Sequence, residues 1–128
     1  MSEINFIGRI VSGRGEGEKY LRLEWVKQQL TEKLGFEPFP GTLNLQLDQN
    51  YIKEKRLLNK KSALGICQST GYCIGLLFKA SIVGQACAVI IPKVKDYPSN
   101  LLEIVSEFDL RRELHLSDND EVEVTVFL

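Results

Sequence analysis

The sequence lacks any apolar run close to the roughly 20 residues that a membrane-spanning helix needs. Its first residues, Met1-Ser2-Glu3-Ile4-Asn5, also lack the basic and apolar regions of a signal peptide. We therefore expect a cytoplasmic protein that does not enter a membrane.

An excess of positive charge is also missing. Lys and Arg total 16 against 17 Asp and Glu, which gives a net charge of −1. A protein that binds a nucleic-acid backbone needs surplus positive charge, so the composition argues against binding of DNA or RNA. The 128 residues, 44% hydrophobic and 26% charged, are typical of one soluble globular domain, and we expect a single domain over residues 1–128.

Histidine and cysteine are scarce. His115 is the only histidine, so a zinc site would have to combine ligands scattered along the chain. Cys67, Cys73 and Cys87 all lie in apolar surroundings, and the first two could face each other across a hairpin. We expect all three to be reduced, buried side chains, as is usual in the cytosol.

Short β-type segments dominate the sequence that is present. Alternating and β-branched patterns predict strands at residues 4–11, 42–47, 63–68, 72–80, 86–91, 101–105 and 121–128, and allow a further short one at 20–23. Apolar spacing predicts a helix at 24–34 and a short one at 110–114, whereas the charge-rich residues 48–61 indicate a solvated connection with at most a helical turn. Closing six or seven such strands into a small barrel would remove the edges of the sheet.

One strand stands out because it alternates strictly. At residues 42–47 its three leucines point to one face, and Thr42, Asn44 and Gln46 point to the other. Since each residue rises roughly 3.3 Å, the Thr42 hydroxyl and the Asn44 amide lie about 7 Å apart along the strand. Two neutral oxygen ligands at this spacing can converge on a hydrated Mg²⁺. The alternative is an ordinary edge strand with a polar outer face.

A glycine-rich segment, Ser12-Gly13-Arg14-Gly15-Glu16-Gly17, follows the first predicted strand. Glycines at alternate positions predict an irregular loop that can approach a ligand closely and bind an anion through its N–H groups. The alternative is a hairpin turn without a ligand. The spacing is neither that of a Walker loop nor that of a dinucleotide-binding fingerprint.

These segments together resemble a known family. The glycine-rich segment, Gly35-Phe36-Glu37-Pro38-Phe39-Pro40-Gly41-Thr42-Leu43-Asn44-Leu45, and residues 110–114 with Leu116 and Asp118-Asn119-Asp120 are similar, in order and spacing, to the archaeal CTP-dependent riboflavin kinases. Residues 50–80 carry little of the resemblance. It implies a mainly β fold, a six-stranded cradle-loop β-barrel with one main helix and a short C-terminal helix. It also implies an enzyme that uses CTP to phosphorylate riboflavin, giving FMN and CDP. From the composition we expect no nucleic-acid or membrane partner, and no obligate protein partner is evident.

The resemblance also assigns residues to sites. Mg²⁺, or another divalent cation, would be bound by Thr42 and Asn44, and the flavin would contact Glu103. The family usually offers the flavin a threonine in the loop after residue 93, where the nearest position here is Lys95; a lysine there could meet the phosphate of FMN. The nucleotide would be held by Arg14, Gly15, Glu16, Gly17, Glu18, Lys19, Phe108, Asp109, Leu110 and Arg111.

The resemblance leaves the general base unassigned, with Glu103 and Glu16 as candidates. Two other functions stay open. The departure at Lys95 is compatible with a flavin- or nucleotide-binding barrel that has lost turnover. Residues 110–126 also resemble the swapped-hairpin motif of a class of DNA-binding transcription factors, although the near-neutral charge argues against that function.

Overall fold

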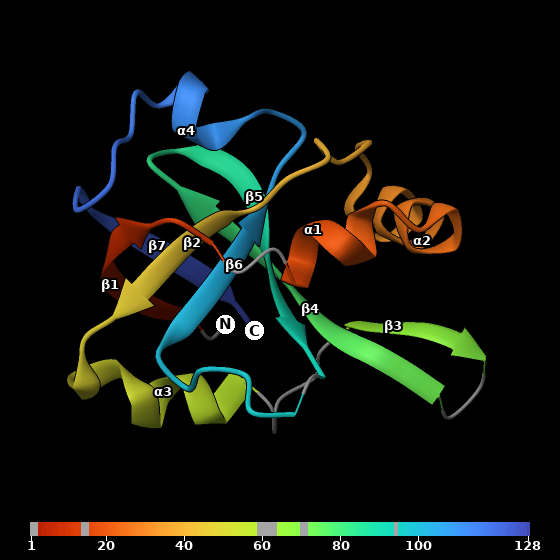
Figure 1. Cartoon of the computed structure of the whole chain (residues 1–128), viewed down its shortest axis with the longest axis horizontal. Coiled ribbons are helices and arrows are strands. Elements are labelled where there is room, and N and C mark those ends of the chain that lie inside the picture. Colours follow the sequence, from red (N-terminus) through yellow and green to blue (C-terminus); the bar gives the residue numbers. More distant parts are fainter. Residues whose placement is uncertain (1–2, 14–15, 59–63, 70–71, 94) are drawn as a thin grey trace.

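Six antiparallel strands close into a barrel, and a seventh strand pairs with one of them to form a hairpin (Figure 1). The computed structural model describes residues 3–13, 16–58, 64–69, 72–93 and 95–128. The order around the barrel is β4-β5-β6-β2-β1-β7, and β7 pairs back onto β4. The barrel strands are β1 (Glu3–Val11), β2 (Leu43–Leu47), β4 (Tyr72–Ile82), β5 (Gln85–Pro92), β6 (Leu101–Val105) and β7 (Glu121–Phe127).

Strand β4 is shared between the barrel and a hairpin. Its first part pairs with β3 (Leu64–Ser69), and its last part closes the barrel through the pair Ala80 and Val126. The hairpin of β3 and β4 projects beyond the barrel (Figure 1). The tight connection from β4 to β5 is made by Val83 and Gly84, both with positive φ, as expected for a two-residue hairpin turn.

The barrel interior is filled by the apolar face of each strand. The leucines of β2 are at most 5% exposed, and they pack with residues of similar burial from the other strands. Members of this core include Phe6, Ile10, Leu43, Leu45, Leu47, Val89, Leu102, Ile104, Val124 and Val126. The strict alternation of β2 therefore sends Asn44 and its polar neighbours to the outside of the barrel wall.

Two helices cover part of the outer wall. Helices α1 (Glu16–Leu21) and α2 (Glu24–Leu34) bury Leu21, Val26 and Leu30 against outward-facing residues such as Ile66 and Ile90. Helix α2 ends at Gly35, whose left-handed conformation (φ 80°) lets its N–H donate to the Thr31 carbonyl.

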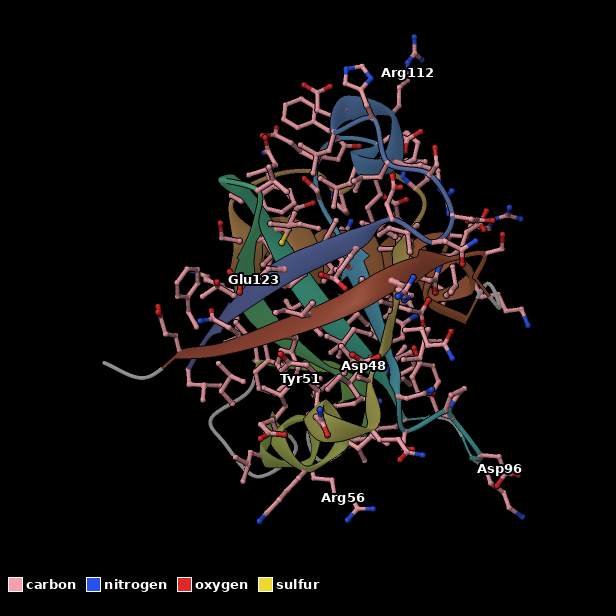
Figure 2. The ribbon with its side chains drawn as sticks, turned by 90° about the vertical axis from the view of Figure 1, so that its left-hand side faces the viewer. Asp48, Tyr51, Arg56, Asp96, Arg112 and Glu123 are labelled. Carbon is pink, nitrogen blue, oxygen red and sulfur yellow. The ribbon has the colours of Figure 1, made fainter. Side chains whose placement is uncertain are left out.

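The remaining helices lie at opposite ends of the barrel (Figure 1). The 3₁₀ helix η1 (Gln49–Tyr51) leads into α3 (Ile52–Leu58) at one end, and α4 (Leu110–Glu113) lies at the other. Figure 2 shows Tyr51 and Arg56 at the α3 end and Arg112 pointing away from the barrel at the α4 end. In the described ranges, no helix is both long and apolar enough to span a membrane.

The predicted mainly β, six-stranded barrel is confirmed, as are the helix at 24–34 and the short helix that begins at residue 110. Two local predictions were wrong. Residues 16–21 form α1 and not a loop followed by a strand at 20–23, because Leu21 gains burial against the barrel wall. Residues 52–58 form α3, in which Lys55 and Leu58 are buried and not solvated. Residues 59–61 of that predicted connection lie outside the described ranges.

The cysteine prediction was wrong at one position. Cys67, paired in register with Cys73, is disulfide-bonded and not reduced. The side chain of Cys73 lies outside what the structure describes. Cys87 is a free, buried thiol as expected, and burial raises its pKa to about 12.

Candidate functional site

Strand β2 lies inside the sheet, and Asn44 on its polar face is buried whereas Gln46 on the same face is exposed. Strand β2 pairs with both β1 and β6, so it is not the edge strand that the alternative interpretation required. Asn44 lies opposite Glu103 of β6 in the register, and the two residues are only 6% and 1% exposed. An amide and a carboxylate buried this deeply on an outer wall need polar partners.

Both oxygens of Glu103 accept hydrogen bonds. Thr42 Oγ1 donates to Oε1 at 3.1 Å, and the phenol of Tyr97 donates to Oε2 at 2.5 Å. Thr42 directly precedes β2, whereas Tyr97 comes from the loop between β5 and β6. The Glu103 carboxylate therefore joins two parts of the chain that the sequence keeps 55 positions apart.

Asn44 has an unused oxygen. Its Nδ2 makes a long hydrogen bond of 3.4 Å to the Thr42 carbonyl, and its buried Oδ1 accepts none within the described residues. Gly13 packs on this amide, since a Cβ built at Gly13 would lie 2.0 Å from Asn44 Nδ2. A buried carbonyl-type oxygen without a hydrogen-bond donor is suited to act as the ligand of a cation.

The donors at this position fit a hard cation. Thr42 Oγ1 and Asn44 Oδ1 are both neutral oxygens. Among the residues that the structure describes, no group of three or more His, Cys, Asp and Glu side chains could hold a metal. Mg²⁺ usually keeps several waters and is bound by few protein ligands together with substrate phosphates, so two neutral oxygens are compatible with this ion.

A small cavity of about 90 Å³ begins beside Thr42. Phe39 and Phe108, both about two-fifths exposed, belong to its lining, and the backbone N–H of Phe39 donates to the Ser106 carbonyl at 2.8 Å. The complete lining is Phe39, Gly41, Thr42, Leu43, Ile104, Ser106, Phe108, Asp109, Leu110 and Arg111. The structure thus brings the four residues 108–111 to the same cavity as Thr42.

Asp118 connects α4 to the beginning of the glycine-rich segment. Its carboxylate accepts from Arg111 Nη2 at 2.8 Å and from Ser12 Oγ at 3.1 Å. The hydrogen bond from the Arg111 guanidinium, followed by that from Ser12, holds the pKa of Asp118 below its usual value. Arg111 also donates to the Val11 carbonyl at 3.5 Å, so its guanidinium lies where the glycine-rich segment leaves β1.

A larger cavity of about 470 Å³ is connected to Glu103 through Tyr97, which belongs to its lining and donates its phenol hydrogen to the Glu103 carboxylate. The walls are Lys55, Leu76, Ile91, Pro92, Lys93, Tyr97 and Ser99. Lys55 is 6% exposed; its Nζ donates to the Pro98 carbonyl at 3.0 Å and lies 5.2 Å from the centre of the Tyr97 ring. Burial lowers the pKa of Lys55 to about 8, against the opposing attraction of Glu103.

The other predicted site residues are distributed as follows. Arg14 and Gly15 lie outside the described residues, and Glu16 and Gly17 are described only as the backbone that starts α1. Glu18 pairs with Arg22 at 2.9 Å, and Lys19 is exposed. Lys95 is also exposed, and it is Lys93 that lines the larger cavity.

Sequence reasoning missed Tyr97, Lys55 and the role of Gly13. Tyr97 belongs to none of the motifs in the sequence, and Lys55 lies in the charge-rich run that predicts a solvated connection. No local pattern marks either residue, because their contacts come from other elements. The alternating glycines of the glycine-rich segment marked Gly13 as part of a candidate site. Its contact with Asn44, however, depends on the pairing of β1 with β2.

Comparison with known proteins gives consistent matches. The family model named CTP-dep_RFKase, described as a domain of unknown function (DUF120), matches residues 10–126. A riboflavin kinase of Ignicoccus hospitalis is 41% identical over 97% of this chain and 72% of its own length. Riboflavin kinases of Pyrobaculum aerophilum and Archaeoglobus fulgidus are 40% and 39% identical, but the chain spans only 63% and 55% of their lengths.

Proposed function

The chain belongs to the CTP-dependent riboflavin kinase family, and from this premise we propose that it transfers the γ-phosphate of CTP to the 5′-hydroxyl of riboflavin, giving FMN and CDP. The observation that carries the proposal is the position of Glu103. Its carboxylate accepts from Thr42, which lines the smaller cavity, and from Tyr97, which lines the larger one. A phosphate donor and an acceptor bound in these cavities would meet within one side chain of each other.

In this proposal riboflavin occupies the larger cavity. Its volume falls in the range of small-molecule sites, and its walls combine apolar side chains with a few polar ones. Leu76, Ile91 and Pro92 suit the flat flavin ring, and the buried Lys55 amine suits the carbonyl edge of that ring. Glu103 would then lie near the ribityl chain, and Lys93 in the cavity lining, or Lys95 two residues further along the loop, would face the phosphate of FMN.

The nucleotide occupies the smaller cavity and the surface beside it. Phe108, with Phe39, offers aromatic surface to the base. Arg111, held by Asp118, offers positive charge to the phosphates. The segment of residues 14–19 follows Gly13 directly, and we assign it to the phosphates because Gly13 already contacts Asn44.

Thr42 and Asn44 would hold Mg²⁺. A bound ion would supply positive charge that offsets the negative charge of the phosphates. The chain itself supplies position: β2 presents both oxygens on one face, Gly13 holds the Asn44 amide in place, and the surrounding burial limits access of water. Phosphoryl transfer needs positioning and charge neutralisation more than covalent chemistry. These residues would supply both kinds of interaction.

Glu103 is the better supported of the two candidates for the base. Its buried carboxylate accepts from Thr42 of the smaller cavity and from Tyr97 of the larger one, and in this proposal it also accepts a hydrogen bond from the attacking hydroxyl and orients it toward the γ-phosphate. The side chain of Glu16 lies outside what the structure describes.

The test is to incubate the protein with riboflavin, CTP and Mg²⁺ and to separate the flavins by chromatography. We expect FMN and CDP in equal amounts, and a loss of at least 100-fold in rate for Glu103→Gln. A folded protein that binds both substrates but forms no FMN would instead be a binding module.

A further inference from the structure

The hydroxyl of Thr42 is oriented by its hydrogen bond. A threonine hydroxyl has one proton, and here Oγ1 donates it to Glu103 Oε1 at 3.1 Å. The oxygen lone pairs are then free to face a cation. If the proton rotated toward the cation, the same oxygen would be a poor ligand. The orientation of this hydroxyl therefore depends on where the Glu103 carboxylate is held.

Glu103 is held in turn by Tyr97. The phenol donates to Oε2 at 2.5 Å, and a hydrogen bond to a buried carboxylate is among the stronger ones in proteins. Glu103 is 1% exposed, so solvent does not replace a lost partner at low cost.

Tyr97 is itself fixed from α3. Lys55 Nζ lies 5.2 Å from the centre of its ring and donates to the carbonyl of the next residue, Pro98, at 3.0 Å. These two contacts anchor the loop that carries Tyr97 to a helix at one end of the barrel. A continuous set of contacts therefore runs from Lys55 through Tyr97 and Glu103 to Thr42.

We propose that Tyr97 is a positioning residue for the divalent cation: it fixes Glu103, and Glu103 fixes the Thr42 hydroxyl with its lone pairs toward the cation. The inference rests on the proposed function, since it takes Thr42 and Asn44 as the cation ligands. It assigns to a residue of the larger cavity an effect on the cation, with which Tyr97 makes no direct contact. Outer partners of this kind typically change metal affinity by about 10- to 100-fold when removed.

The experiment measures CDP binding by calorimetry over a series of Mg²⁺ concentrations, without riboflavin and therefore without turnover. Tyr97→Phe removes the phenol hydroxyl and keeps the ring under Lys55. We expect the Mg²⁺ midpoint to rise about tenfold, with CDP affinity in excess EDTA unchanged. The EDTA measurement shows that the nucleotide site is folded. The matched control is Tyr51→Phe, which removes a hydroxyl from a ring that packs on Phe6, and its midpoint should equal that of the wild type.

The outcomes separate the inference from the proposed function. A wild-type Mg²⁺ midpoint in Tyr97→Phe overturns the inference alone. A variant in which only riboflavin affinity falls also overturns it, because Tyr97 would then act by touching the flavin. If the wild-type protein binds CDP without any dependence on Mg²⁺, the proposed cation site and this inference are both wrong.

Discussion

Gly13 packs closely against the side-chain amide of Asn44, so that a methyl group at Gly13 would lie 2.0 Å from Nδ2 and 2.9 Å from Oδ1. The two residues belong to segments that sequence reasoning had treated separately, the glycine-rich segment and the strand with alternating leucines. Their contact means that the glycine fixes the position of the proposed cation ligand as well as allowing the chain to turn.

Gly13→Ala should therefore displace Asn44. A contact this short forces a shift, and overpacking of this kind typically costs about 1–3 kcal/mol. We expect a lower melting temperature and weaker Mg²⁺-dependent binding of CDP. In an Asn44→Ala background the three clashing atoms are gone, so adding Gly13→Ala should cost much less. Additive losses of stability in the double variant would show that the clash is not the cause.

Asn44→Ala tests the cation ligand itself. Since Oδ1 accepts no hydrogen bond in the described part of the chain, its removal should change the free energy of unfolding by less than about 1 kcal/mol. FMN formation should fall at least tenfold at limiting Mg²⁺. Gln46→Ala is the matched control, because Gln46 is an exposed amide on the same strand face. Equal Mg²⁺ dependence in the two variants would remove Asn44 from the site.

Lys55 should give the stability a distinctive pH dependence. Its pKa is lowered from 10.5 to about 8 in the folded protein, so between these values the unfolded chain binds a proton that the folded chain does not. Stability from this group therefore rises with pH across that window, by at most about 3 kcal/mol. Chemical denaturation at pH 7 to 10 should show the wild type gaining stability relative to Lys55→Met. A constant difference across this range would mean that Lys55 has an ordinary pKa.

Nucleotide choice is the sharpest test of the donor. The smaller cavity has a volume of about 90 Å³, and a pyrimidine base is smaller than adenine. A base that leaves buried polar groups unpaired can be rejected by about 10⁴-fold. We predict good use of CTP, poor use of ATP and intermediate use of UTP, measured as FMN formation at equal nucleotide concentration. Equal or faster turnover with ATP would contradict CTP as the donor even if riboflavin were the acceptor.

The sequence was informative wherever one element determines the outcome. Alternation at Leu43, Leu45 and Leu47 correctly predicted which face of β2 enters the core, and the apolar spacing correctly placed α2. The helix at residues 16–21 was not predicted from the sequence, because α1 is stabilised by packing on the barrel wall and not by a local pattern.

The candidate site was predictable only in part for the same reason. Thr42 and Asn44 share a strand face, so their proximity followed from the period of a strand. Tyr97 and Lys55 come from a loop and from a helix, and only the closed barrel brings them to Glu103. The run of charges around Lys55 carried no sign that one of its lysines would be buried.

The pairing of β1 with β7 has a consequence for the order of folding. The register joins Glu3 to Phe127 and Arg9 to Glu121, so this seam of the barrel is made by residues far apart along the chain. Contacts of such high sequence separation carry a large loop-closure entropy and slow the folding of barrels. The hairpin of β4 and β5 has a two-residue turn, so it can form from neighbouring residues without this entropic cost. During synthesis one side of β1 therefore stays unpaired until β7 has left the ribosome, and in that interval a chaperone or an incorrect strand can bind it.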